Sequence, residues 1–192
     1  MAREMTAELK PRKISVAEYR RMAEVGILDS DERVELLDGV IVEMSPIGMP
    51  HWRLHGRIVE YLVRRLGSRG FVAGQASVAL GEFNEPQPDI LIVPPEQERL
   101  DAPEPRPDEI WAVVEIADSS LLKDTGPKRA LYERFEIRDY LVADVGGARL
   151  LRYAPRSSGS YGEPAVLGHG DRFRLAAIPD VELEAGAFLP PP

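Results

Sequence analysis

The chain has 192 residues, no cysteine and a formal net charge of −8. Its 44% hydrophobic and 29% charged residues are typical of one globular domain, and the lack of cysteine excludes disulfides and thiolate metal sites. The N-terminus has no apolar signal-peptide segment and no apolar run reaches membrane-spanning length, so we expect a cytoplasmic protein without membrane partners. The acidic net charge counts against a nucleic-acid ligand, although a local basic face is compatible with an acidic total.

The first half of the chain carries clear helix and hairpin signals. Ser15 and Glu18 have the spacing of a capping box, which opens a helix. Asp38-Gly39 lies between two alternating runs, which is the strongest short hairpin signal. In order, we predict a helix over residues 15–24, a hairpin over 33–43, a loop over 45–50, an amphipathic helix over 51–66, and strands over 71–80 and 88–93.

The second half alternates buried strands with one helix. In order, we predict a surface loop over residues 94–109, a strand over 110–117, a helix over 124–136, strands over 139–144 and 148–153, and short β-like runs in the tail. Pro127 falls in the first turn of the predicted helix, where proline is tolerated. The order of elements predicts an α/β fold with a mixed α+β sheet, in one domain over residues 14–192 after a flexible arm over residues 1–13.

The predicted helix over residues 51–66 has an apolar stripe and a basic face. Arg53, Arg57 and Arg64 lie on the basic face, together with Glu60. From residue 51 to residue 74 the chain has five arginines and one glutamate, which gives a local charge of +4 with histidine neutral. This face is equally compatible with exposure to solvent and with contact to phosphate groups.

Two carboxylates interrupt the apolar strands predicted in the middle of the chain. Asp89 opens the run I-L-I-V, and Glu115 divides W-A-V-V from I-A. An ionised carboxylate that is left dry and unpaired costs several kcal/mol, so something must compensate it. A divalent cation would compensate both, and Mg²⁺ prefers such oxygen ligands. Either residue alone is also explained without a metal, Asp89 as a turn cap and Glu115 as the partner of an arginine.

These carboxylates belong to an ordered set of motifs that spans most of the chain. The set comprises E-L-L-D-G at 35–39, M-S-P at 44–46, His51, P-D at 88–89, V-E-I at 114–116, D-T-G-P-K at 124–128, Tyr132 and D-Y-L-V-A-D at 139–144. In order and spacing it closely resembles the Uma2 family of restriction-type endonucleases, which share the PD-(D/E)XK nuclease core. The lysine usually found two residues after the central glutamate is here Ala117, a departure that the family shows.

The resemblance implies a restriction-endonuclease-like core with flanking helices and extra hairpins, built around a metal site. Three acidic residues would bind Mg²⁺ or Mn²⁺: Asp89, Glu115 and Glu35, the last directly, through water or as a base. Lys128 would orient the attacking water and offset charge at the scissile phosphate. Tyr132 would line the site and His51 would contact phosphate. Without the resemblance, Glu35 is a solvent-facing hairpin carboxylate, Lys128 a surface lysine and Tyr132 a core residue.

The sequence thus predicts a metal-dependent endonuclease that hydrolyses phosphodiester bonds in nucleic acid, with DNA favoured. The residues expected to contact the nucleic acid are His51, Arg53, Arg57, Arg64 and Tyr132. The alternative is a catalytically silent nuclease-like domain that serves as a binding or oligomerisation module, which the acidic net charge favours. Because many nucleases cut two strands as two-fold dimers, we expect a homodimer.

Overall fold

The structure is a computed structural model that describes residues 11–29, 31–156 and 159–191. Its strands are β1 (Val34–Leu37), β2 (Val40–Glu43), β3 (Phe71–Gly74), β4 (Ile90–Val93), β5 (Ala112–Ala117), β6 (Asp139–Asp144), β7 (Arg149–Tyr153), β8 (Ala165–Leu167), β9 (Arg172–Leu175) and β10 (Ile178–Glu184). Its α-helices are α1 (Val16–Glu24), α2 (Met49–Leu66), α3 (Leu121–Lys123) and α4 (Arg129–Arg134). Short 3₁₀-helices are η1 (Gly67–Arg69), η2 (Pro95–Glu98), η3 (Pro107–Glu109) and η5 (Ala185–Phe188), and η4 (Asp124–Lys128) is one turn of π-helix.

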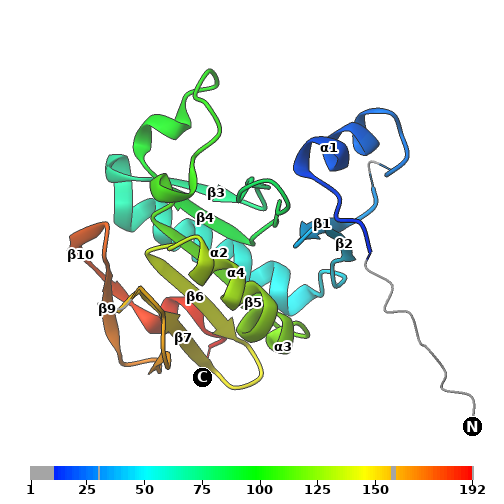
Figure 1. The fold of residues 1–192 in the computed structure, drawn as a ribbon. Helices are drawn as coiled ribbons and strands as arrows, with labels where there is room; N and C mark the ends of the chain where they lie inside the picture. Colours follow the sequence, from blue (N-terminus) through cyan, green and yellow to red (C-terminus); the bar gives the residue numbers. More distant parts are fainter. Residues whose placement is uncertain (1–10, 30, 157–158, 192) are drawn as a thin grey trace, which may run out of the picture.

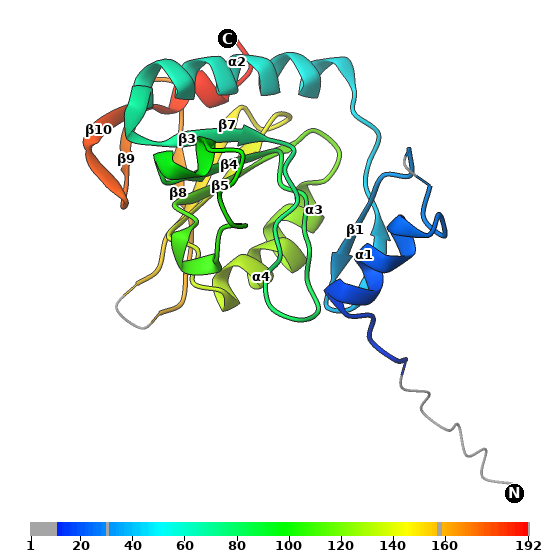
Figure 2. The ribbon, with the colours of Figure 1, turned by 90° about the horizontal axis from the view of Figure 1, so that it is seen from above.

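Within the described residues, six strands form one mixed sheet in the order β3-β4-β5-β6-β7-β8. β5 and β6 are parallel and are joined through α3 and α4, whereas the other neighbouring pairs are antiparallel. α2 covers one face of the sheet, and α3 and α4 cover the other, so the domain has three layers (Figure 2). The predicted α/β fold with a mixed sheet is confirmed.

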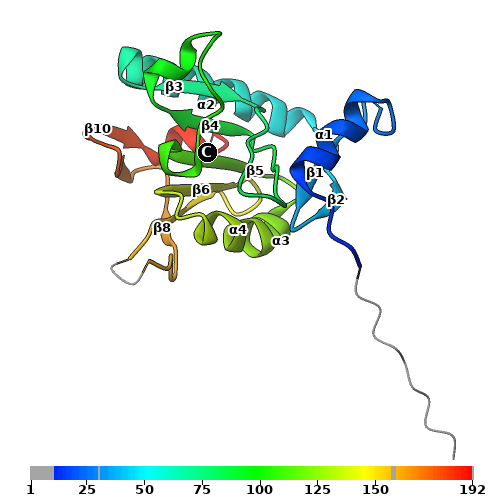
Figure 3. The same ribbon diagram turned by 45° about the horizontal axis from the view of Figure 1, so that its top comes forward.

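A hairpin and a helix lie at one end of this sheet. β1 and β2 pair around Asp38 and Gly39, whose φ angles of 50° and 78° are those of the tight turn predicted from Asp-Gly. Ser15 caps α1 through the predicted capping box with Glu18. Both α1 and the hairpin lie on the side of α3, where β5 ends (Figures 1 and 3). The hairpin therefore stands beside the end of the sheet that carries the candidate site.

Alternating residues of β5 divide the hydrophobic core into two parts. Val114 and Ile116 pack on the side of α2. Val113 and Ala117 pack on the opposite side, together with residues of α4. Successive side chains of a strand point to opposite faces, so Glu115 points to the side of α4. A carboxylate is thus placed inside the layer between the sheet and this helix.

The helix predicted over residues 124–136 starts earlier and changes its pitch. It begins at Leu121 and continues through one π-turn into α4. The N–H of Arg129 donates to the carbonyl of Asp124, five residues back, which is the bond of a π-turn. Pro127 lies inside this turn and not in the first turn as predicted. Proline has no N–H for the α-helical bond, and the wider turn accommodates that loss.

The described part of the predicted arm packs against the hairpin. Most of the flexible arm predicted over residues 1–13 lies outside the described residues, which begin at residue 11. The ammonium of Lys13 lies 5.6 Å from the ring centroid of Phe83, and the N–H of Ile14 donates to the carbonyl of Gly39 at 2.9 Å. Lys13, the last residue of the predicted arm, is thus in contact with the ring of Phe83. Among helices in the described ranges, none has both the length and the apolar character needed to cross a membrane.

We predict opposite effects on stability for two glycine-to-alanine changes. Gly39 has φ +78°, and a Cβ there would lie 2.5 Å from the Cβ of Lys13. Gly39→Ala should lower the free energy of unfolding by about 1–2 kcal/mol. Gly56, inside α2, has open space around such a Cβ, so Gly56→Ala should raise it by about 0.5–1 kcal/mol. Urea unfolding of the two variants checks this, and an unaltered midpoint for Gly39→Ala would contradict the assigned turn.

Candidate active site

The candidate site lies where β4 begins, β5 ends and α3 starts. β4 and β5 are antiparallel with Ile90 opposite Val114, so Asp89 and Glu115 follow at neighbouring positions of this register. Both carboxylates line one cavity with Lys128, which comes from the π-turn, and with His51 from the first turn of α2. The sheet register and the crossover helix therefore bring together residues that are far apart in the sequence.

The carboxylate of Asp89 is held by two donors. The backbone N–H of Ile116 donates to Oδ2 at 2.7 Å, and Nε2 of His51 lies 3.0 Å from the same oxygen. Asp89 is 9% exposed, so this carboxylate lies at the border between core and cavity. Nδ1 of His51 is a buried nitrogen without a hydrogen-bond partner among the described residues. His51 therefore acts on Asp89 through Nε2. Its predicted contact with phosphate stays a prediction.

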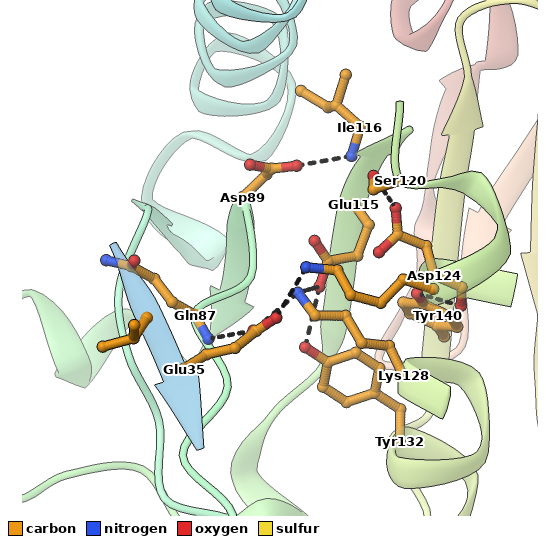
Figure 4. Close-up of polar contacts among 12 residues, drawn as sticks. Glu35, Gln87, Asp89, Glu115, Ile116, Ser120, Asp124, Lys128, Tyr132 and Tyr140 are labelled. Atoms are coloured by element: carbon orange, nitrogen blue, oxygen red, sulfur yellow. Dashed lines mark hydrogen bonds and ion pairs between the residues drawn. The ribbon is translucent and has the colours of Figure 1, made fainter. Parts of the chain in front are cut away.

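Glu115 is buried and is held through one oxygen. Nζ of Lys128 donates to Oε1 at 2.9 Å and the hydroxyl of Tyr132 donates to the same oxygen at 3.1 Å (Figure 4). The pKa of Glu115 is raised to about 8, mainly by burial and to a smaller extent by the nearby carboxylates of Asp124 and Asp89, while the ammonium of Lys128 lowers it. Because both donors use Oε1, Oε2 is left to carry a proton or to bind a cation.

Lys128 joins Glu115 to the hairpin carboxylate of Glu35. Its Nζ lies 2.9 Å from Oε1 of Glu115 and 3.0 Å from Oε2 of Glu35, and its side chain is 2% exposed. Burial lowers the pKa of this amine, but the facing carboxylates of Glu115 and Glu35 outweigh burial and raise the pKa above its ordinary value. The ammonium therefore stays charged at neutral pH inside the core.

A residue that the sequence analysis did not single out completes this arrangement. Nζ of Lys123 donates to Oε1 of Glu35 at 3.1 Å, so each oxygen of Glu35 faces a different lysine. Glu35 itself is fully buried, which excludes the solvent-facing hairpin carboxylate considered from the sequence. Lys123 was missed because it stands one residue before the D-x-x-x-K motif. The only available signal was its position at the predicted start of the helix.

The π-turn holds the helical residues in place. Ser120 donates a short hydrogen bond to Oδ2 of Asp124, and the hydroxyl of Tyr140 donates to the carbonyl of Asp124 at 2.8 Å. Asp124, Lys128 and Tyr132 are spaced by four residues and all three are buried, as one face of a helix requires. Burial raises the pKa of Tyr132 well above its ordinary value, with a further contribution from Glu115. Tyr132 therefore remains a hydrogen-bond donor to Glu115.

The donor set suits a hard divalent cation held by few carboxylates. Within the described residues, no group of three His, Asp or Glu side chains is arranged to hold a metal ion, so the predicted trio of Asp89, Glu115 and Glu35 is not preassembled. Mg²⁺ typically uses one or two carboxylates and keeps several waters. Asp89 and Glu115 provide two carboxylates at neighbouring positions of the register of β4 and β5. The pKa of Glu115 is raised mainly by burial and secondarily by nearby carboxylates, and a bound cation would favour its charged form.

The predicted basic face of α2 separates into two kinds of arginine. Nη2 of Arg57 donates to the carbonyls of Gly186 and Leu189 near the C-terminus, so its guanidinium ties α2 to that segment. Arg64 is exposed and pairs with Glu60 at 2.6 Å, and Arg53 is exposed. None of the three lines the cavity that contains Asp89 and Glu115. Contact with nucleic acid stays a prediction for Arg53 and Arg64, whereas the contacts of Arg57 are accounted for within the fold.

We predict a pH signature of Glu115 in the metal-free protein. Its pKa rises from an ordinary 4.5 to about 8 on folding, so this carboxyl favours the folded state below pH 4.5 and loses that contribution as pH rises towards 8. Glutamine keeps an Oε1 acceptor but has no proton to lose. The Tm of Glu115→Gln minus that of the wild type, measured in EDTA, should therefore increase from pH 5 to pH 8. A difference that stays constant over this range would contradict the assigned environment.

Comparisons with known proteins concern the family and the fold of the chain. The family model Uma2, described as "Putative restriction endonuclease", matches residues 16–186. A solved structure from Anabaena variabilis, titled as a putative nuclease belonging to DUF820, superposes with a TM-score of 0.70 at 14% identity and covers 91% of this chain and 97% of its own. No curated protein matches the chain. At this identity the solved structure establishes a shared fold, and the family match covers most of the chain. The chain therefore belongs to the Uma2 family.

Proposed function

We propose that this protein is a divalent-metal-dependent endonuclease that hydrolyses phosphodiester bonds in nucleic acid, with DNA as the expected substrate. The observation that carries the proposal is the convergence of Asp89, Glu115 and Lys128 on one cavity at the end of β5. Membership of a family described as putative restriction endonucleases supports the same reaction class. The solved DUF820 structure, titled as a putative nuclease, supports it through the shared fold.

The residues of the site have separable tasks in this proposal. Asp89 and Glu115 would hold Mg²⁺ or Mn²⁺, which when bound lowers the pKa of a water and neutralises charge on a phosphate. The N–H of Ile116 and Nε2 of His51 fix the carboxylate of Asp89. Lys128 and the hydroxyl of Tyr132 fix Oε1 of Glu115, so that Oε2 would be the oxygen that binds a ligand. A prearranged set of this kind lowers the reorganisation needed during the reaction.

The substrate is proposed from features outside the cavity. DNA is proposed from the family description and from the exposed arginines of α2, which would contact phosphates outside the cavity. The homodimer and the cytoplasmic location stay predictions from the sequence. Two observations favour the alternative of a silent nuclease-like module. Glu115 is already bound by Lys128, and the described residues contain no three-acid metal cluster.

We predict that Asp89→Asn and Glu115→Gln each lower plasmid cleavage in Mn²⁺ by about 100-fold or more, because each removes one charged ligand. Both substitutions keep the size of the side chain, so the fold should be retained. Gel-based cleavage rates at saturating Mn²⁺ measure the effect. Asp180→Asn is a matched control, because Asp180 is exposed and pairs with Arg69 on the surface. Wild-type rates in either site variant would show that the site is assigned wrongly.

We also predict that Mn²⁺ stabilises the wild-type protein and not Asp89→Asn. A ligand present at about 100 times its Kd adds about 2.7 kcal/mol to the free energy of unfolding, which raises Tm by about 5 °C or more in a chain of this size. Thermal unfolding in EDTA and in millimolar Mn²⁺ gives the comparison. If the wild-type Tm does not respond to Mn²⁺, the silent nuclease-like module becomes the better account.

A further inference from the structure

Two lysines approach the site from neighbouring turns, and they differ in what they can reach. We propose that Lys123, and not the motif lysine Lys128, is the cation that contacts a phosphate of the substrate, while Glu35 positions both lysines. This inference rests on the proposed nuclease function and assigns a substrate-binding residue within the same site. It replaces the metal-binding role that the sequence suggested for Glu35.

Lys128 is committed to the protein. Its side chain is 2% exposed, and its Nζ lies within 3.0 Å of one oxygen each of Glu35 and Glu115 (Figure 4). Two of its three N–H donors are used by these carboxylates, and the amine that carries the third is buried. A substrate phosphate would therefore have to leave water and enter the core beside two carboxylates, which is unfavourable. Lys128 is therefore suited to hold the two carboxylates and not to bind a ligand that arrives from solvent.

Lys123 has the exposure and the spare donors that Lys128 lacks. Its side chain is 24% exposed, and among the described residues its one ion pair is with Oε1 of Glu35 at 3.1 Å. An ammonium has three N–H donors, so two remain for phosphate oxygens. Because Glu35 is fully buried and also bound by Lys128, it anchors the lysine without competing for its outward side.

The position of Lys123 in the cavity fits a phosphate that enters from outside. Lys123 lines the cavity that contains Asp89 and Glu115. It also lines a second hollow, which shares Ser45, Asp118, Ser119 and Ser120 with this cavity. Because its side chain is partly exposed, solvent reaches it from this side of the cavity. The carboxylates on the cavity wall repel a polyanion, and an accessible ammonium at this point offsets that repulsion. Lys123 is thus placed to bind a phosphate close to the metal carboxylates.

The test is steady-state DNA cleavage in Mn²⁺ at several NaCl concentrations, with Lys123→Met, Lys123→Arg and Lys13→Met. Lys123→Met should raise KM about tenfold, as expected for loss of one hydrogen bond to a charged group, and lower kcat by less. The slope of log KM against log salt concentration should fall by about one, because one phosphate contact is lost. Lys123→Arg should restore both values towards the wild type, which a role in packing alone would not produce.

Lys13→Met is the matched control for the loss of one positive charge, because Lys13 packs on Phe83 away from the cavity. If Lys123→Met gives the KM and salt slope of Lys13→Met, or loses kcat with KM unchanged, the inference is wrong.

Asp89→Asn in the same assay separates the two proposals. An active Asp89→Asn overturns the nuclease site itself, whereas an inactive one beside an unaltered Lys123→Met overturns the role of Lys123 alone. A wild-type protein that cuts no DNA overturns both.

Discussion

The buried ammonium of Lys128 is the interaction on which the site depends. A charged amine in a core costs several kcal/mol unless it is paired, and here it is paired with two carboxylates from β1 and β5. One cation thereby joins three segments that are remote in the sequence: the hairpin, the central strand and the π-turn. Removing Glu35, Glu115 or Lys128 takes one charged partner away from a buried group. Because the buried ammonium of Lys128 must be paired with carboxylates, the fold of the hairpin is coupled to the geometry of the site.

The topology of the sheet supplies the remaining constraints. β4 runs antiparallel to β5, so the start of one strand adjoins the end of the other, and Asp89 meets the backbone of Ile116. The parallel pairing of β5 with β6 requires a crossover, and its first turns must pass over the same end of the sheet. The π-turn in this crossover accommodates Pro127 and turns Asp124 and Lys128 inward. Strand order and helix pitch together place acids and lysines around one cavity.

Local signals in the sequence predicted the elements whose causes are local. The Asp38-Gly39 turn requires positive φ, and the apolar run around Glu115 predicted a buried strand with a carboxylate inside it. The motif set also predicted that Asp89, Glu115 and Lys128 meet. Other tertiary contacts were not indicated by any pattern in the sequence. Arginine spacing on α2 could not distinguish a phosphate from the C-terminal carbonyls that Arg57 binds, and no spacing rule indicated that Lys123 and Lys128 share Glu35.

The most direct test of the account is a crystal structure of the wild-type protein in Mn²⁺, with anomalous scattering used to locate the metal. The account predicts a manganese peak bound by the carboxylates of Asp89 and Glu115, with Glu35 still on the two lysines. A peak bound by Glu35 in place of Glu115, or no peak at Asp89 and Glu115 in millimolar Mn²⁺, would contradict it.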